Sequence, residues 1–327
     1  MELDKMKAIT RQKYGYSDVI KVSKVNKPNP KADEVLIKVH VTTVNRTDCA
    51  ILTGKPFVMR VFLGLFSPKI EVTGTDFAGE IISVGEKEKI YKKGDLVFGF
   101  KDLGLRSQAE YMTLKTNQPM STLPERLSCM EAVTALEGMH YAYNMINKVS
   151  IKPRDKILIN GASGAIGSSL VQIAKSLGAY ITVVCSSNHK DLMEYLKVDQ
   201  MIDYKIENFT KSNESYDFVF DAVGKSSFSK CKPILKDKGI YISSEPGDHG
   251  QNLFLSLITP ILGGKKVIFP FPSDIKRTIK YAKKLIEEDN YRPVIDRTYT
   301  LDETAEAYDY VFSGHKKGSV IIEVNPS

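Results

Sequence analysis

Three glycines at a fixed step, Gly161, Gly164 and Gly167, are the residues whose type and spacing point most directly to chemistry. Glycine lets the main chain approach a ligand closely, and the free amides of a helix start hold negative charge. Such a turn suits the pyrophosphate of a dinucleotide, although GxxGxxG differs from the standard GxGxxG. The predicted phosphate-binding residues are Gly161, Ser163, Gly164, Ala165 and Ile166.

The segments around this turn predict a strand before it and a helix after it. An apolar run at 157–159 stops at Asn160, and apolar residues then recur at helical spacing from Ile166 to Leu177. Further strand-like runs lie at 180–185, 201–204, 216–221, 240–243 and 267–269. This alternation predicts an α/β fold with a doubly wound parallel sheet, whose ligand lies at the carboxyl ends of the strands. A parallel sheet without a nucleotide is the alternative.

Length and composition bound the class of protein. The 327 residues suffice for about two domains. Contents of 42% hydrophobic and 26% charged residues are those of an ordinary globular chain. The net charge of +7 is scattered along the sequence, so we expect no nucleic-acid partner.

The sequence shows no targeting signal and no cysteine motif that would indicate secretion or redox chemistry. The charged N-terminus resembles neither a signal peptide nor an anchor, and the apolar run at 253–262 is short and interrupted by Pro260. We therefore expect no membrane partner and a cytoplasmic location. The four cysteines form no CxxC pair, which indicates reduced thiols, mostly buried.

Residues 6 to about 120 have a different pattern of predicted elements from the middle of the chain. Short strand-like runs at 34–41, 80–84 and 95–100 alternate with turn signals and predict a compact β domain. A helix-like bridge at 128–148 follows. The C-terminal part adds predicted helices at 274–288 and 302–312 and a strand at 319–324.

Motifs along nearly the whole chain resemble the medium-chain dehydrogenase/reductase superfamily, specifically its zinc-free quinone oxidoreductase branch. In order they are MKAITRQKYG from residue 6, VNRTD at 44–48, GTDFAGEIISVG at 74–85, GDLVFG at 94–99, QAEY at 108–111, INGASGAIG at 159–167, IDY at 202–204, FDAVG at 220–224 and GHKKGSVII at 314–322.

The resemblance implies an architecture and an assembly. It implies a GroES-like β-barrel catalytic domain at 1–123, completed by 271–327, and a Rossmann NADP-binding domain at 124–270. The active site would lie in the cleft between these domains. A homodimer is also implied, joined through the edge of the Rossmann sheet near 267–270.

The resemblance also bears on metal. Zinc-dependent relatives hold catalytic zinc with a cysteine in a CxxD pattern and a histidine in a GHE pattern. This chain has Asn45 and Thr75 at those places. Cys49 is out of register, no histidine has a partner at ligand spacing, and the four-cysteine structural lobe is missing. We expect no zinc.

Cofactor choice is determined at the end of the second strand of the parallel sheet, where an acid favours NAD. The residues at 185–190 include no acid, and Ser186, Ser187 and Lys190 can donate to a 2′-phosphate, so we expect NADPH rather than NADH. A helix-capping role at 187–188 is the alternative. The resemblance adds Tyr204 beside the adenosine, and Ser319 departs from a family lysine. It also adds the cofactor residues Val223, Gly224, Ser243 and Phe269.

Two residues are candidates for catalysis. By resemblance, Asn45 lies near the nicotinamide, where its amide would hydrogen-bond a substrate carbonyl. Arg46 would steady a developing anion by its charge. Asn45 is alternatively a turn former after the preceding strand, and Arg46 a surface ion-pair residue. Asp48 is expected to hold the loop by accepting backbone amides.

The apolar segment 57–66 is the predicted substrate-binding element. As a helical lid it would place Phe57 and Phe62 over a hydrophobic ring, but ordinary core packing explains its composition equally well. His140 is a further substrate-site candidate, and His140 or Tyr143 would donate a proton. A buried, satisfied hydrogen bond is the alternative for both.

Together with these residues, the resemblance implies zinc-independent, NADPH-dependent hydride transfer to a quinone or an α,β-unsaturated carbonyl. Two alternatives stay open. A metal-free alcohol or carbonyl dehydrogenase would lack a Lewis acid to activate the alcohol. A non-catalytic NADPH-binding sensor is compatible with the same fold.

Overall fold

The structure is a computed structural model that describes residues 4–325 and contains two compact units. The first unit runs through Glu137 and includes Ile275–Glu287 and the chain from Arg292 onward. The second unit comprises Gly138–Asp274 and Glu288–Tyr291. The units divide after Glu137 and Asp274, whereas the sequence analysis placed the limits after residues 123 and 270.

The second unit is built on a six-stranded sheet of order β10-β9-β8-β11-β12-β13. Every neighbouring pair is parallel, and the chain order reverses on either side of β8 and β11, as in a doubly wound sheet. All six predicted strands are therefore confirmed. Their bounds are β8 Lys156–Asn160, β9 Tyr180–Cys185, β10 Gln200–Asp203, β11 Tyr216–Asp221, β12 Leu235–Ser243 and β13 Lys266–Ile268.

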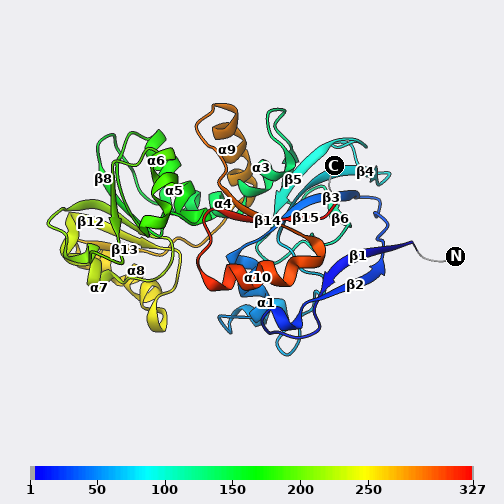
Figure 1. Ribbon diagram of the computed structural model, residues 1–327, viewed down its shortest axis with the longest axis horizontal. Coiled ribbons are helices and arrows are strands. Elements are labelled where there is room, and N and C mark those ends of the chain that lie inside the picture. The colour runs from blue at the N-terminus through cyan, green and yellow to red at the C-terminus, as the bar shows by residue number, and fades with distance from the viewer. Residues whose placement is uncertain (1–3, 326–327) are drawn as a thin grey trace. The chain divides into compact units, whose positions relative to one another are not determined.

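Helices cover both faces of this sheet, because β8 to β10 and β11 to β13 advance in opposite directions with right-handed crossovers. Figure 1 shows α5 and α6 on one side and α7 and α8 on the other. Apolar residues of α7 and α8 pack with those of the strands. The ring of Phe228 lies against that of Tyr241, and Leu255 packs against the same buried cluster. The helix bounds are α4 Glu137–Ile146, α5 Ala165–Ser176, α6 Lys190–Tyr195, α7 Phe228–Cys231 and α8 Gln251–Leu262.

The first unit has a seven-stranded sheet of order β14-β15-β3-β4-β5-β7, with β6 paired to β3, and a separate β1-β2 hairpin. Its pairs are antiparallel except for β14 with β15. The bounds are β1 Lys5–Thr10, β2 Lys21–Asn26, β3 Glu34–Val44, β4 Asp76–Val84, β5 Leu96–Phe100, β6 Tyr111–Lys115, β7 Met120–Thr122, β14 Ile295–Thr300 and β15 Ser319–Glu323.

Two clusters of buried side chains join helices to this sheet. One contains Leu52 of α1 and Tyr308 of α10 with residues of β3 and β4. The other contains Val133 of α3 and Ile279 of α9 with residues of β4 and β5, which explains why α3 belongs to the first unit. The bounds are α1 Arg46–Thr53, α2 Met59–Leu63, α3 Cys129–Thr134, α9 Ile275–Glu287 and α10 Thr304–Ser313.

Two local predictions were wrong. The bridge at 128–148 is two helices, α3 and α4, separated at residues 135–136, rather than one. Pro260 does not interrupt the apolar run, because it lies inside α8 near its C-terminal end. In the part of the chain that the structure describes, no helix has the length and apolar character needed to cross a membrane.

Candidate functional site

The predicted glycine turn joins β8 directly to α5. Gly161 follows the strand with a φ of 83°, a conformation that favours glycine, and Gly164 is the N-cap of α5. Gly164 has no side chain to cap the helix, so the first amides of α5 depend on other acceptors. The turn thus presents backbone donors at the start of a twelve-residue helix.

The three glycines have different roles. A Cβ at Gly161 would lie 2.3 Å from Val223 Cγ1, and one at Gly167 would lie 2.2 Å from the carbonyl oxygen of Gly161. These two positions need glycine for packing within the turn. A Cβ at Gly164 would find its nearest atom 3.9 Å away. Space at Gly164 therefore stays open where a phosphate would approach the helix start.

A buried carboxylate, Asp221, organises the loop after β11. Its Oδ1 accepts hydrogen bonds from the amides of Val223 at 3.3 Å and Gly224 at 3.0 Å, and from Asn160 Nδ2 at 3.0 Å. Its Oδ2 accepts from Tyr241 Oη at 3.0 Å. Val223 and Gly224 were predicted from the sequence as cofactor residues, whereas Asp221 was not. The signal was available, because an acid at a strand end followed by Ala-Val-Gly is typical of a loop-capping carboxylate.

The other predicted cofactor residues of the second unit follow the same edge of the sheet. Ser243 ends β12 and is buried, and its Oγ donates to the Glu245 carbonyl oxygen at 3.2 Å. Phe269 follows β13 and packs edge-to-face against Phe271, with ring centroids 4.8 Å apart. Tyr204 follows β10 and is 56% exposed. The structure thus brings these candidates to the carboxyl ends of parallel strands.

The end of β9 requires a correction. Ser186 caps the short helix Ser187–His189, and Lys190 lies 3.6 Å from Glu194 in an exposed ion pair. The amide of Ser187 donates to Oδ2 of Asp203 at 2.8 Å. Residues 185–190 contain no acid, as noted from the sequence, but Asp203 at the end of the neighbouring parallel strand lies beside Ser187. Hydrogen bonding from Ser187 lowers the pKa of Asp203, so its carboxylate is charged at neutral pH.

In the first unit, Asn45 is the N-cap of α1 and is buried. Its Oδ1 accepts from the amide of Asp48 at 2.9 Å, and Oδ2 of Asp48 accepts from the amide of Asn45 at 3.1 Å. Asn45 Nδ2 lies within hydrogen-bonding distance of three acceptors, at 2.9 to 3.2 Å, namely the hydroxyl oxygens of Thr43 and Thr75 and Oδ2 of Asp76. The alternative to a catalytic role for Asn45 was a turn former after β3, and the structure shows it as a helix cap instead. Asp48 accepts a backbone amide, as its predicted loop-holding role requires.

Buried carboxylates surround Asn45. Oδ1 of Asp76 accepts from the amide of Thr43 at 2.8 Å, and burial raises the pKa of Asp76 to about 6. Burial, with the neighbouring Asp76 charge, raises the pKa of Asp48 well above its usual range. Burial also raises the pKa of Glu137, which accepts a hydrogen bond from Thr47, and the charge of Lys316 opposes that shift. Arg46, at the first position of α1, is exposed.

The predicted lid is mostly solvent-exposed. Only Met59–Leu63 is helical, and Leu63 is its buried residue. Phe57 and Phe62 are each 65% exposed, so packing into the core does not explain the segment. His140, by contrast, is fully buried in α4, where Asn144 Nδ2 lies 3.4 Å from its Nδ1. Burial lowers the pKa of His140 to about 4, so its imidazole is neutral at pH 7.

Comparison with known proteins gives two family matches. Residues 31–135 match the alcohol dehydrogenase GroES-like domain, and residues 196–322 match a family described as zinc-binding dehydrogenase. A 2-methylene-furan-3-one reductase of Solanum lycopersicum is 30% identical over 98% of this chain and 80% of its own length. The chain belongs to the medium-chain dehydrogenase/reductase superfamily.

Further comparisons identify the branch. A chloroplastic quinone-oxidoreductase homolog of Spinacia oleracea is 29% identical over 97% of this chain and 98% of its own. The solved quinone oxidoreductase of Coxiella burnetii has a TM-score of 0.84 at 25% identity, over 98% of this chain and 100% of that one. The chain is thus an oxidoreductase of the quinone-oxidoreductase-like branch, with a GroES-like and a Rossmann-type domain.

Membership in a family described as zinc-binding raises the question of whether these residues suit zinc. The two positions that correspond to metal ligands are Asn45 and Thr75, and the Asn45 amide donates to the Thr75 hydroxyl at 2.9 Å. An amide and a hydroxyl bonded to each other are not the thiolate and imidazole donors that zinc prefers. Within residues 4–325, no group of three or more His, Cys, Asp or Glu residues is arranged to hold a metal.

Proposed function

We propose that this oxidoreductase is a zinc-independent, NADPH-dependent reductase that transfers hydride to a quinone or an α,β-unsaturated carbonyl. The observation that carries the proposal is the turn at Gly164, where a side chain is missing and space is open at the start of α5. The names of the spinach, tomato and Coxiella relatives, which include quinone oxidoreductase and reductase, support the same class.

NADPH would supply the hydride, and the residues of this chain would bind and orient it. Amides of the first turn of α5 hold the pyrophosphate, with Ser163, Ala165 and Ile166 beside it. Val223 and Gly224, fixed by Asp221, line the path toward the nicotinamide, with Ser243 and Phe269 at the adjacent strand ends. Ser186, Ser187 and Lys190 donate to the 2′-phosphate, against the charge of Asp203.

Asn45 and Arg46 remain our candidates for acting on the acceptor. Asn45 can donate to a carbonyl oxygen only by giving up one of its present acceptors, such as Thr75. Arg46, exposed beside it, can stabilise an anionic product by charge. The exposed rings of Phe57 and Phe62 offer apolar contact to an acceptor ring. Because His140 is buried and neutral, we assign it a structural role instead of substrate binding.

The test is NADPH oxidation by EDTA-treated protein with quinones, enones, enals and simple aldehydes, with NADH in parallel. Turnover of the conjugated acceptors, faster with NADPH, supports the proposal. Activity that EDTA abolishes and zinc restores contradicts it. Turnover confined to simple alcohols or aldehydes favours the dehydrogenase alternative, and tight NADPH binding without any turnover favours a sensor.

We also propose a homodimer formed through the edge strand β13 and helix α8. Among the described residues 4–325, β13 has one hydrogen-bonded neighbour strand, β12, so its other edge is available for pairing. Phe254, Leu257 and Ile261 recur at helical spacing on α8 and are 64 to 85% exposed. Leu257→Glu combined with Ile261→Glu should convert dimers to monomers in light scattering, and Phe66→Glu, at another exposed apolar site, should not.

Residence in the cytoplasm stays a prediction, since the spinach relative is named chloroplastic.

A further inference from the structure

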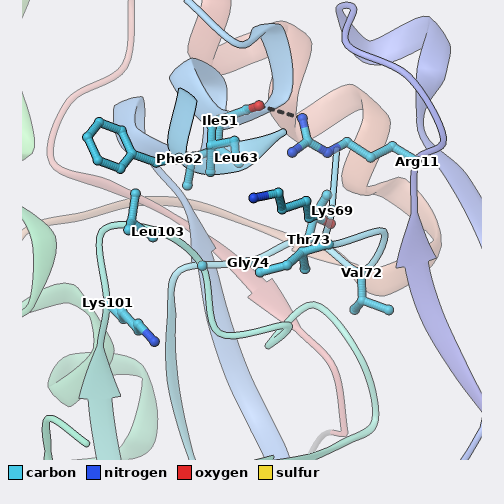
Figure 2. A pocket seen from close by; sticks show the side chains of 12 residues that line it. Arg11, Ile51, Phe62, Leu63, Lys69, Val72, Thr73, Gly74, Lys101 and Leu103 are labelled. Carbon is cyan, nitrogen blue, oxygen red and sulfur yellow. Dashed lines mark hydrogen bonds between the residues drawn. The ribbon is translucent and has the colours of Figure 1, made fainter. Parts of the chain in front are cut away.

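The first unit contains a cavity of about 260 Å³ between α2, the loop before β4 and the loop after β5. Its walls come from the end of β1, the last turn of α1, helix α2, and the segments 69–74 and 101–104. Figure 2 shows Arg11 and Lys69 on one side, and Phe62, Leu103 and Lys101 on the other. All of these residues belong to the first unit.

The charge of this cavity is entirely positive. Arg11, Lys69 and Lys101 contribute cations, and none of the twelve lining residues is acidic. Lys69 is exposed and Lys101 is half-buried. Neither ammonium group has a carboxylate partner within residues 4–325. Together the three side chains favour an anion at this place.

Arg11 is the unusual member, because its side chain is only 3% exposed. Nη1 donates to the carbonyl oxygen of Ile51 at the C-terminal end of α1. Nε is buried and has no hydrogen-bond acceptor in the described chain. No carboxylate of residues 4–325 forms an ion pair with this guanidinium. Burial lowers its pKa, and the more distant Tyr308, Tyr14 and Asp48 oppose that shift only in part. A buried cation with an unused donor is costly unless something supplies an anion.

The rest of the lining is apolar. Ile51, Leu63, Ile70, Val72 and Leu103 form the walls, and the Phe62 ring stands at one side. A cavity of this volume lies near the small end of the range for ligand sites, so it suits a compact molecule. Inorganic phosphate carries no apolar surface and would leave these walls unused.

We propose that this cavity binds a small organic monocarboxylate with an apolar body, whose carboxylate lies between Arg11 and Lys69. A guanidinium and an ammonium on one side match the two oxygens of a single carboxylate. The apolar walls match a short chain or a ring. This binding site goes beyond the proposed hydride transfer. It shares Phe62 with the contact proposed for the hydride acceptor, but it requires no cofactor and can be tested without one.

The test is calorimetric titration of the cofactor-free protein with benzoate and hexanoate, compared with the neutral isostere benzamide and with inorganic phosphate. Benzoate or hexanoate should bind at least tenfold more tightly than benzamide. Lys69→Met should weaken carboxylate binding about tenfold, since a charged hydrogen bond is lost. Lys93→Met is the matched control, because Lys93 is exposed and lies outside the cavity; it should leave the affinity unchanged.

Several results would overturn the proposal. They are no detectable carboxylate binding at millimolar concentration, equal affinity for benzoate and benzamide, tighter binding of phosphate than of either carboxylate, and unchanged benzoate affinity in Lys69→Met, whatever the effect of Lys101→Met. Both lysines have solvent-accessible side chains, so we expect these variants to fold, and thermal unfolding verifies it. Because titration uses no NADPH, failure here is distinguishable from failure of the reductase assay.

Discussion

The two candidate regions of this oxidoreductase are built from different parts of the chain. The turn at Gly161 to Gly167 binds through backbone amides, and its residues matter because they lack side chains. The region around Asn45 consists of buried polar side chains that bond one another, including Asp48 and Asp76. The first region leaves space open for a ligand, whereas the second is already satisfied internally.

The two regions should respond differently to substitution. A side chain added to the turn should act on the ligand or on local packing, depending on the glycine chosen. A side chain removed from the Asn45 region should leave buried partners without hydrogen bonds and act first on stability. Substitutions that separate affinity from stability are therefore the sharpest way to test the contrast.

The largest expected effect is that of Gly164→Val. The new side chain would meet no protein atom closer than 3.9 Å at Cβ, so the fold should persist. It would fill the approach to the first amides of α5, and several charge-assisted hydrogen bonds would be lost. NADPH affinity should fall about a thousandfold, or about 4 kcal/mol, in fluorescence titration.

The matched variant is Gly167→Ala in the same turn. Its Cβ would lie 2.2 Å from the Gly161 carbonyl oxygen, so we expect lower thermal stability as well as weaker binding. If Gly164→Val unfolds as readily as Gly167→Ala, or binds NADPH normally, the turn does not work as we describe.

His140 and Asp76 should change the free energy of unfolding in opposite directions as the pH falls. Burial lowers the pKa of His140 to about 4, compared with 6.5 in the unfolded chain. Between these pH values the unfolded chain binds a proton that the folded protein does not. The free energy of unfolding that His140 contributes is therefore complete above pH 6.5 and is lost as pH falls to 4. The loss is about 3 kcal/mol. Asp76 affects the free energy of unfolding in the opposite direction, because burial raises its pKa to about 6. Burying its charged form destabilises the protein above pH 6, and this destabilisation disappears as pH falls from 6 toward 3.8.

Urea unfolding between pH 4 and 8 measures both effects. His140→Gln should flatten the loss of stability at acid pH, and Asp76→Asn should steepen it. Equal slopes in the original protein and in His140→Gln would mean that His140 is not buried in its neutral form.

Asn45→Ala should cost about 2 kcal/mol of unfolding free energy, because a helix cap is lost and buried acceptors are left without their donor. Ser128→Ala is the matched control. Ser128 also caps a helix through a capping box with Glu131, but Ser128 is exposed, so its loss should cost about 1 kcal/mol. A strong loss of reductase turnover in Asn45→Ala without a loss of stability would instead support direct contact with substrate.

The parallel-sheet unit was predictable because its signals are local. Each strand is a short apolar run, and the glycine step marks the turn, so all six strands and α5 were found. The exposed state of Phe57 and Phe62 was not predictable, because an apolar segment fits a core and an open surface equally well. The partners of Asn45 also escaped prediction, since they come from β3 and β4 through long-range pairing.

Asp203 illustrates an intermediate case. The strand ending at this residue was predicted within one position, yet the consequence for cofactor choice was missed. Neighbouring parallel strands end at the same edge, so the register of Asp203 with Cys185 places its carboxylate beside Ser187. Both strands were predicted from the sequence, but the pairing of β10 with β9 in the sheet was not.

The smallest expected effect is that of Asp203→Asn on cofactor preference. Asparagine retains an acceptor for the Ser187 amide but removes a negative charge from the end of β9. The ratio of kcat/KM for NADPH to that for NADH should rise about fivefold, because repulsion of the 2′-phosphate is reduced in a well-solvated place.

Asp199→Asn is the control. Asp199 also accepts a backbone amide, that of Ile181 at 2.8 Å, but it lies near the amino end of β9. An equal change in both variants would indicate an effect of net charge. A fall in NADPH preference only in Asp203→Asn would mean that Asp203 positions the donors of Ser187 instead of opposing the phosphate.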